Sequence, residues 1–203
     1  MIAIDPASQS TQDNYKLLIG SVIPRPIALV TTMSEEGVLN AAPFSFFNIV
    51  SANPPLLSVS VQRKSGVKKD TAAHAESREE FVVHIADETY IKAINATAAP
   101  VPPEVSEVEL AGLTAVASDV ISVPGIAEAR IRMECVLERS IPLGGTDDAP
   151  SCDLLIGRVV RFHLDEALYD RGKINPELLS PVSRLAGHDY AKLGERFTLE
   201  RPL

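Results

Sequence analysis

Three short segments decide the fold and the site of this chain: PRPIALVTT (Pro24–Thr32), NAAPFSFFN (Asn40–Asn48) and KDT (Lys69–Thr71). They bring hydroxyl, amide and ammonium groups close to apolar and aromatic residues. Hydrogen-bond donors can hold a phosphate, and apolar walls can hold a flat ring. The segments therefore indicate a site for a phosphorylated aromatic ligand.

The same stretch begins a series of predicted strands. Ile27–Met33 is rich in β-branched residues and predicts a strand, and the turn SEEG lets Val38–Ala42 return antiparallel to it. Further strands are expected at Phe46–Ser51, Leu56–Val61, Phe81–Ile85, Ala129–Arg139 and Leu154–Leu164, and helices at Ser65–Arg78 and Glu88–Ala98, with a short helical turn at Tyr15–Ile19. Because the alternation of a doubly wound sheet is missing, the pattern favours an antiparallel barrel or sandwich.

The length of 203 residues suits one domain, since a chain of this size buries roughly 70% of its unfolded surface. Residues 1–14 are polar and are expected to form an N-terminal arm, with the domain at 15–203. The proline-rich AAPVPPE lies between segments of continuing strand character, so we interpret it as a long surface loop rather than a linker.

The formal net charge of −8 disfavours binding to nucleic acid or to an anionic membrane, because both need a basic surface. Cys135 and Cys152 form neither a disulfide framework nor a CxxC pair. The N-terminus lacks the pattern of a signal peptide, and no apolar run reaches the roughly 20 residues of a membrane span. We expect a soluble, cytoplasmic protein.

The usual phosphate-binding loops, GxxxxGK[ST] and GxGxxG after a strand, are absent. A phosphate must then be held by side-chain hydroxyls, amides and a few cations. The candidates are Thr31, Thr32, Ser45, Ser65, Lys69 and Thr71. Taken singly, each is also an ordinary strand or turn residue; their grouping within one span is what favours a site.

The KDT segment has two interpretations that the spacing leaves open. Asp70 is expected to cap the following helix, whose first N–H groups would attract a phosphate next to Lys69. The alternative is an ordinary capped surface helix with a solvated lysine pair.

The role of Phe44, Phe46 and Phe47 is also left open by the sequence. By default such residues pack in the core, and the alternative is that they form a wall that binds the ring of a ligand.

Other chemistries find little support in the sequence. His74, His84, His163 and His188 do not stand at metal-ligand spacing with Cys, Asp or Glu, so no metal site is expected. There is no GxSxG motif, and both cysteines are interpreted as structural thiols. No residue is singled out as a catalytic acid, base or nucleophile.

At PRPIALVTT, NAAPFSFFN and KDT the chain resembles the flavin reductase-like family of FMN-binding split barrels. Five later segments agree with that family in the same order: FVVHI, EVELAGLTAV, RMECVLE, LLIGRVVRFHL and RLAGHDY. The resemblance covers about residue 15 to the end. It implies an antiparallel Greek-key split β-barrel with a few short helices, a homodimer, and FMN near the subunit interface.

The resemblance also implies a set of cofactor-binding residues. Those expected to line the flavin are Thr31, Thr32, Asn40, Ala42, Pro43, Phe44 and Ser45, with Arg25 close by; those at the phosphate end are Ser65, Lys69, Asp70 and Thr71; Arg184 and Tyr190 belong to a C-terminal segment near the site. The chain departs from many relatives at His74, His84 and Ala186, which affects the expected substrate side and C-terminal contacts.

By this resemblance the protein is an FMN-binding oxidoreductase that takes hydride from NADH or NADPH. It would pass electrons to free flavin or to another acceptor, which includes an acceptor protein. Such chemistry needs no general acid or base, because the cofactor carries the difficult step. The alternatives are a flavin-carrying electron-transfer protein without nicotinamide chemistry, and a structural or regulatory dimer that has lost the cofactor.

Overall fold

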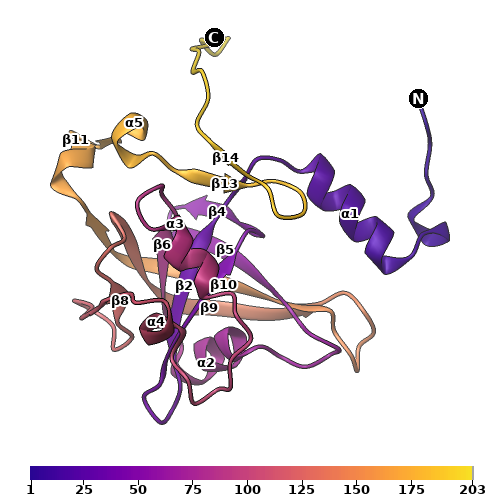
Figure 1. Cartoon of the computed structure of the whole chain (residues 1–203), viewed down its shortest axis with the longest axis horizontal. Helices are drawn as coiled ribbons and strands as arrows, with labels where there is room; N and C mark the ends of the chain where they lie inside the picture. The colour runs from indigo at the N-terminus through magenta and orange to yellow at the C-terminus, as the bar shows by residue number, and fades with distance from the viewer. Residues whose placement is uncertain (203) are drawn as a thin grey trace.

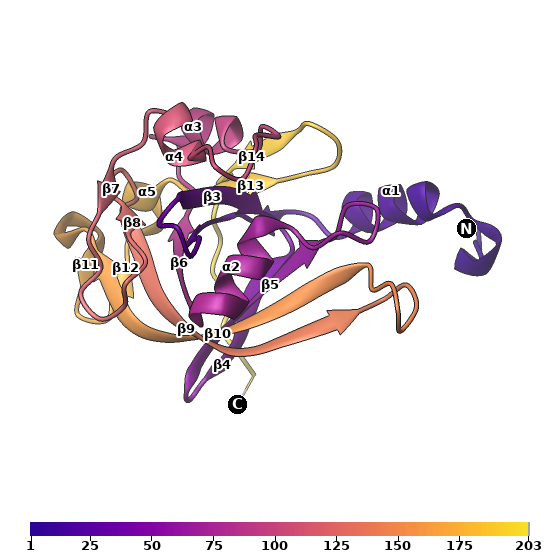
Figure 2. The same cartoon turned by 90° about the horizontal axis from the view of Figure 1, so that it is seen from below.

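The computed structural model describes residues 1–202 and consists mainly of β-strands. Seven strands form one antiparallel sheet in the order β3-β2-β6-β9-β10-β5-β4. Their bounds are β2 Ala28–Met33, β3 Leu39–Phe44, β4 Phe47–Ala52, β5 Pro55–Gln62, β6 Glu80–Ile85, β9 Ile131–Leu143 and β10 Cys152–Leu164. The predicted antiparallel split β-barrel with a few short helices is therefore confirmed (Figures 1 and 2).

Shorter elements complete the fold. The strands outside the main sheet are β1 Arg25–Pro26, β7 Ala115–Val116, β8 Gly125–Ile126, β11 Tyr169–Asp170, β12 Lys173–Ile174, β13 Val182–Arg184 and β14 Tyr190–Lys192. The helices are α1 Thr11–Ser21, α2 Asp70–Arg78, α3 Ile91–Ala96, α4 Glu107–Leu110 and α5 Pro176–Leu179, with 3-10 turns at Pro6–Ser8 and Glu166–Leu168. None of the helices within residues 1–202 is long and apolar enough to cross a membrane.

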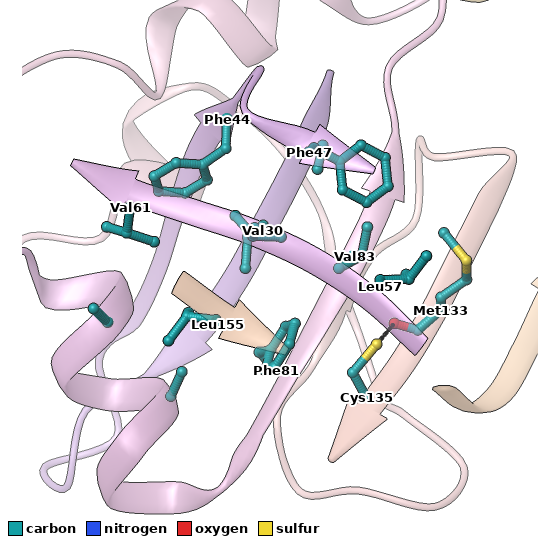
Figure 3. Close-up of a cluster of buried hydrophobic side chains, with 14 of the residues drawn as sticks. Val30, Phe44, Phe47, Leu57, Val61, Phe81, Val83, Met133, Cys135 and Leu155 are labelled. Carbon is teal, nitrogen blue, oxygen red and sulfur yellow. Dashed lines mark hydrogen bonds between the residues drawn. The ribbon is translucent and has the colours of Figure 1, made fainter. Parts of the chain in front are cut away.

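The barrel interior is one apolar cluster that draws on every strand of the main sheet. It includes Val30, Val59, Phe81 and Leu155, and two alanines of α2 join it (Figure 3). The ring of Phe81 lies against Gly157 of β10, where an added Cβ would come within 2.3 Å of the ring. Only glycine fits that position, so the close approach of β6 and β10 depends on it.

A second cluster covers the opposite face of β2. Leu29 packs there with Ile94 of α3 and Val108 of α4, while Val30 points into the barrel. Strand β2 is thus buried on both faces, which explains its unbroken apolar and β-branched sequence.

The N-terminal helix is longer than the sequence predicted. Instead of a turn at Tyr15–Ile19, α1 runs from Thr11 to Ser21 because the Ser10 hydroxyl caps it by accepting a hydrogen bond from the Asp13 N–H at 3.1 Å. The helix projects away from the barrel (Figures 1 and 2). It also crosses residue 14, so the division into an arm and a domain remains a prediction.

The helix predicted at Ser65–Arg78 begins later, at Asp70, and its cap differs from the expected one. Ser65 and Gly66 have positive φ angles of 52° and 77°, which a helix cannot contain. Lys69 is the N-cap residue and makes no side-chain cap, while Asp70 is the first helical residue. The expected capping role of Asp70 is therefore corrected to an acidic residue in the first turn, which still favours the helix dipole.

His84 links β6 to the neighbouring strands from a fully buried position. Its Nδ1 donates to the Leu29 carbonyl oxygen at 2.9 Å, and its Nε2 accepts from the Ile126 N–H at 2.9 Å. This bonding requires the neutral ring, and burial lowers the pKa of His84 to about 4. The two backbone partners of His84 could not be predicted from the sequence, because they come from β2 and β8, which meet β6 only in the folded chain.

Glu134 fastens the segment between β7 and β8 in a comparable way. Its buried carboxylate accepts from the N–H groups of Asp119, Val120 and Ile121 at 2.6–3.2 Å, and from His163 Nε2 at 2.5 Å. Asp119, Glu134 and His163 are close enough together to suggest a cation site. However, the Glu134 oxygens already have four donors, so the cluster is accounted for as a loop anchor.

We predict an acid-dependent loss of stability that depends on His84. As the pH falls below the ordinary His pKa of 6.5, the unfolded chain takes up a proton there, whereas the folded protein does not until about pH 4. The stabilisation from neutral His84 is therefore full above pH 6.5 and lost as the pH falls toward 4. The destabilisation caused by His84→Gln should shrink by roughly 2–3 kcal/mol between pH 7 and pH 4.5.

Urea unfolding of the native protein and the variant across this range measures the effect. His188→Gln, a change at an exposed histidine, is the matched control and should leave the pH profile unaltered. Parallel profiles for the native protein and His84→Gln would contradict the assignment.

Candidate functional site

A continuous cleft runs along one side of the barrel and consists of two adjoining cavities. The loop cavity, of about 790 Å³, is lined by the segment from Lys64 to Thr71, by Asn40–Phe44, by Thr97–Val101 and by Glu107. The hairpin cavity, of about 670 Å³, is lined by residues of α1, β1, α3 and Pro43–Phe46 and by five residues of the β13–β14 hairpin: Arg184, Leu185, Gly187, His188 and Tyr190. The cavities share Pro43, Phe44, Lys69 and Ala98, so they form one cleft.

The loop cavity contains the N-terminus of α2. Lys69, Asp70 and Thr71 all line it, and the N–H groups of Ala72 and Ala73 bond back to the Lys69 carbonyl. The earlier N–H groups of such a helix end point outward and carry partial positive charge. Together with Lys64 and Lys69, they make this end of the cleft suited to an anion.

The hairpin cavity carries an excess of cationic side chains although the protein is acidic. Arg25, Lys69 and Arg184 line it, and no Asp or Glu is among its lining residues within the described chain. The net charge of the whole chain is −8. The positive character of the cavity is thus a local arrangement that favours a negatively charged ligand.

Asn40 anchors the wall between the barrel and α2. Its Nδ2 donates to the hydroxyls of Thr32 and Thr71, each at 3.2 Å, so β3, β2 and α2 meet at this side chain. Asn40 and Thr71 both line the loop cavity. Thr32 lies behind them, fully buried, and supports Asn40 rather than lining the cleft.

Thr31 is placed differently from the sequence expectation. Its side chain is fully buried, and its hydroxyl donates to the Pro124 carbonyl oxygen at 2.8 Å. Neighbouring residues of a strand face opposite sides, so Thr31 and Thr32 cannot share one wall. Thr31 therefore holds the segment that precedes β8 and belongs to neither cavity.

Arg25 borders the hairpin cavity, but its guanidinium is occupied by the protein itself. Nη1 donates to the carbonyl oxygens of Ile19 and Val22, both at 2.6 Å, and Nη2 to that of Leu185 at 2.7 Å. This planar group thus joins the end of α1 to the chain after β13. Its role near the site is structural: it fixes one wall of the cavity.

Arg184 and Tyr190 lie opposite each other on the β13–β14 hairpin. The Arg184 guanidinium stacks 4.6 Å from the centroid of the Tyr190 ring and donates to the Tyr190 hydroxyl. That hydroxyl in turn donates to Asn95 Oδ1 of α3 at 3.1 Å. The pair therefore joins the β13–β14 hairpin to α3 beside the hairpin cavity, which both side chains line.

Most of the expected residues meet in the cleft. Those that line it are Arg25, Asn40, Ala42, Pro43, Phe44, Ser45, Ser65, Lys69, Asp70, Thr71, Arg184 and Tyr190. Of the three phenylalanines, Phe46 lines the hairpin cavity, Phe47 packs in the core, and Phe44 takes part in both the core and the cleft.

Several lining residues were not predicted from the sequence. Lys64 and Lys68 precede the KDT segment, and only their position in the sequence distinguishes them from Lys69. Glu107 is buried, accepts from the Ala41 N–H at 3.2 Å, and has a pKa raised by burial. A carboxyl group facing an apolar strand had no signal in the sequence, because α4 meets β3 only in the folded chain.

A family model described as a flavin reductase like domain matches residues 19–177. The chain belongs to this family. It is similar to the crystal structure of nitrilotriacetate monooxygenase component B from Bacillus cereus, with 66% identity, a TM-score of 0.97, and coverage of 98% of both chains. It also resembles 2-nitrobenzoate 2-nitroreductase NbaA from Pseudomonas fluorescens, with 32% identity, a TM-score of 0.89, and coverage of 99% and 96%. An uncharacterized protein of Bacillus subtilis is 57% identical over 95% of each chain.

We predict that Arg25→Met loosens α1 and the adjoining cavity wall. The change removes three hydrogen bonds to carbonyl oxygens and should destabilise the fold by at least about 2 kcal/mol. Faster amide hydrogen exchange at the C-terminal end of α1 and around Leu185 is the specific sign. Arg158→Met, which breaks the exposed pair with Glu138, is the matched control and should leave both regions unchanged. Equal exchange in the two variants would refute the clamp.

Proposed function

We propose that the cleft binds FMN. The phosphate would lie at the loop cavity, where Ser65, Lys69, Thr71 and the N-terminus of α2 supply donors. The ring would lie along the shared wall of Pro43 and Phe44, toward the hairpin cavity. The observation that carries this proposal is the combination of a helix N-terminus and lysines with an adjoining aromatic wall in one cleft.

The residues present fit such a ligand. Each cavity has a volume within the roughly 300–1,000 Å³ of small-molecule sites. The lysines of the loop cavity suit a phosphate dianion, although Asp70 and Glu107 also line that cavity, and no Asp or Glu of the described chain lines the hairpin cavity. Membership of the flavin reductase like family supports flavin as the ligand.

The proposed activity is that of an NAD(P)H-dependent oxidoreductase. FMN held in the cleft would supply the redox chemistry, namely hydride acceptance from a reduced nicotinamide and electron transfer to an acceptor. The protein's own residues would bind and orient the reactants: cations would hold phosphates, and the Arg184–Tyr190 pair would form part of the wall of the hairpin cavity. The names of the two similar structures, a monooxygenase component and a nitroreductase, support redox chemistry of this kind.

We further propose that the protein is a homodimer. Leu17, Leu18 and Val22 at α1, and Ile49 and Val50 on β4, are exposed apolar side chains. An apolar helix that projects into solvent would gain stability by packing against a second copy. The partner subunit would then complete the surroundings of the cleft, since Tyr15 and Ile19 of the same helix line the hairpin cavity.

Spectroscopy of the purified protein tests the proposed function. We expect visible absorption of bound flavin after reconstitution with FMN, and bleaching when NADH or NADPH is added without oxygen. Bleaching by neither nucleotide, but by a reduced partner protein, would favour an electron-transfer protein. Failure to bind FMN at all would overturn the proposal.

We predict that Lys69→Gln weakens FMN binding about tenfold, the value of one charge-assisted hydrogen bond to a phosphate. Riboflavin, which lacks the phosphate, should bind the variant and the native protein equally. Lys173→Gln, at an exposed lysine of β12, is the matched control. Quenching of flavin fluorescence gives both affinities, and an equal loss for FMN and riboflavin would remove Lys69 from the phosphate end.

A further inference from the structure

A buried carboxylate lies directly behind the loop that lines the cleft. Asp153 of β10 is fully buried and receives both arms of the Arg63 guanidinium, from Nε at 2.9 Å and from Nη2 at 2.6 Å. Lys68 Nζ is 3.9 Å from the same carboxylate. Arg63 and Lys68 stand at the two ends of the short loop between β5 and α2, so one carboxylate reaches both of its ends.

A second carboxylate fixes the loop from the side of the helix. Lys68 pairs with Glu76 of α2, and the Ser140 hydroxyl of β9 donates to the other oxygen of Glu76 at 2.6 Å. The Arg63 N–H also donates to the Ser151 carbonyl oxygen at 2.8 Å. The loop is thus held by the carboxylates of Glu76 on α2 and Asp153 on β10, and Ser140 of β9 in turn holds Glu76.

These contacts divide the four cations of the segment into two groups. Arg63 and Lys68 are engaged with carboxylates, whereas Lys64 and Lys69 have no carboxylate partner within the described chain. Between Lys64 and Val67 the chain makes a tight turn, with reciprocal hydrogen bonds of 3.0 and 3.1 Å. The turn contains two positive-φ residues: Gly66 adopts this conformation freely, whereas for Ser65 it costs free energy that the surrounding contacts must offset.

We propose that Asp153 is a positioning residue for recognition of the ligand's phosphate. It does not border the cleft; it acts through Arg63, which fixes the loop so that Ser65 and Lys69 face the phosphate. This inference rests on the proposed function, because it assigns a phosphate to the loop cavity. A preorganised loop binds more tightly because less conformational entropy is lost on binding.

The test compares FMN with riboflavin in Asp153→Asn. The substitution keeps the shape of the side chain but removes the charge that holds Arg63. We expect the FMN dissociation constant to rise on the order of tenfold, as when an outer residue that orients a ligand-binding group is changed. The riboflavin dissociation constant should change less than twofold. An equal effect on both ligands, or on neither, would overturn the proposal.

Matched variants keep the result interpretable. Asp165→Asn removes the carboxylate partner of Arg130 and should leave the ratio of the two affinities unaltered. If Asp153→Asn does not fold, Arg63→Lys keeps the positive charge but loses the two-armed geometry, and should reduce the FMN preference in the same way. If Asp153 acts through Arg63, the double variant Asp153→Asn with Arg63→Lys should be no worse than the more damaging single change.

The native protein distinguishes this inference from the proposed function. If it fails to bind FMN, the proposed function fails. If it prefers FMN to riboflavin and Asp153→Asn keeps the full preference, FMN binding stands and only the positioning role of Asp153 is refuted.

Discussion

The contact between Phe81 and Gly157 is the constraint on which the rest of the structure depends. The Phe81 ring occupies the space in the barrel interior that a side chain at position 157 of β10 would need. Even a Cβ added to Gly157 would come within 2.3 Å of the ring. Interiors packed at this density do not deform continuously, so β6 and β10 have one workable separation. The large ring and the missing side chain therefore fix the width of the barrel.

The position of β10 in turn sets the cleft. Asp153, Leu155 and Gly157 alternate along one face of the strand, so the residues that fill the interior continue into the carboxylate under the loop. Strand β10 also pairs with β5, with Asp153 opposite Val61, and β5 leads into that loop. The paired strands β5 and β10 therefore contribute to the barrel core and also support the loop that lines the cavity. This shared support gives the site a rigid base.

Much of this arrangement could be predicted from the sequence, because strands and small-residue segments are local patterns. Ile27–Met33 and Leu154–Leu164 predicted β2 and β10 within two residues at each end. The failures involve the choice of hydrogen-bond partner. Thr31 bonds to the distant Pro124, and Arg25 bonds to the nearby carbonyl oxygens of Ile19 and Val22 and to the distant one of Leu185. A hydroxyl or guanidinium in a motif does not show which group it will meet.

Lys68 and Lys69 make the same point within the candidate site. They are adjacent, chemically identical and both border the loop cavity. Yet Lys68 is neutralised by Glu76 and lies near Asp153, whereas Lys69 is shared by both cavities without a carboxylate partner in the described chain. A lysine that is paired with a carboxylate helps to fix the shape of the loop, whereas a lysine without such a partner attracts an anion. Whether an acidic protein can recognise a phosphate therefore depends on which lysines its carboxylates engage, and here Glu76 and Asp153 engage Lys68 and Arg63 and leave Lys69 without a carboxylate partner in the described chain.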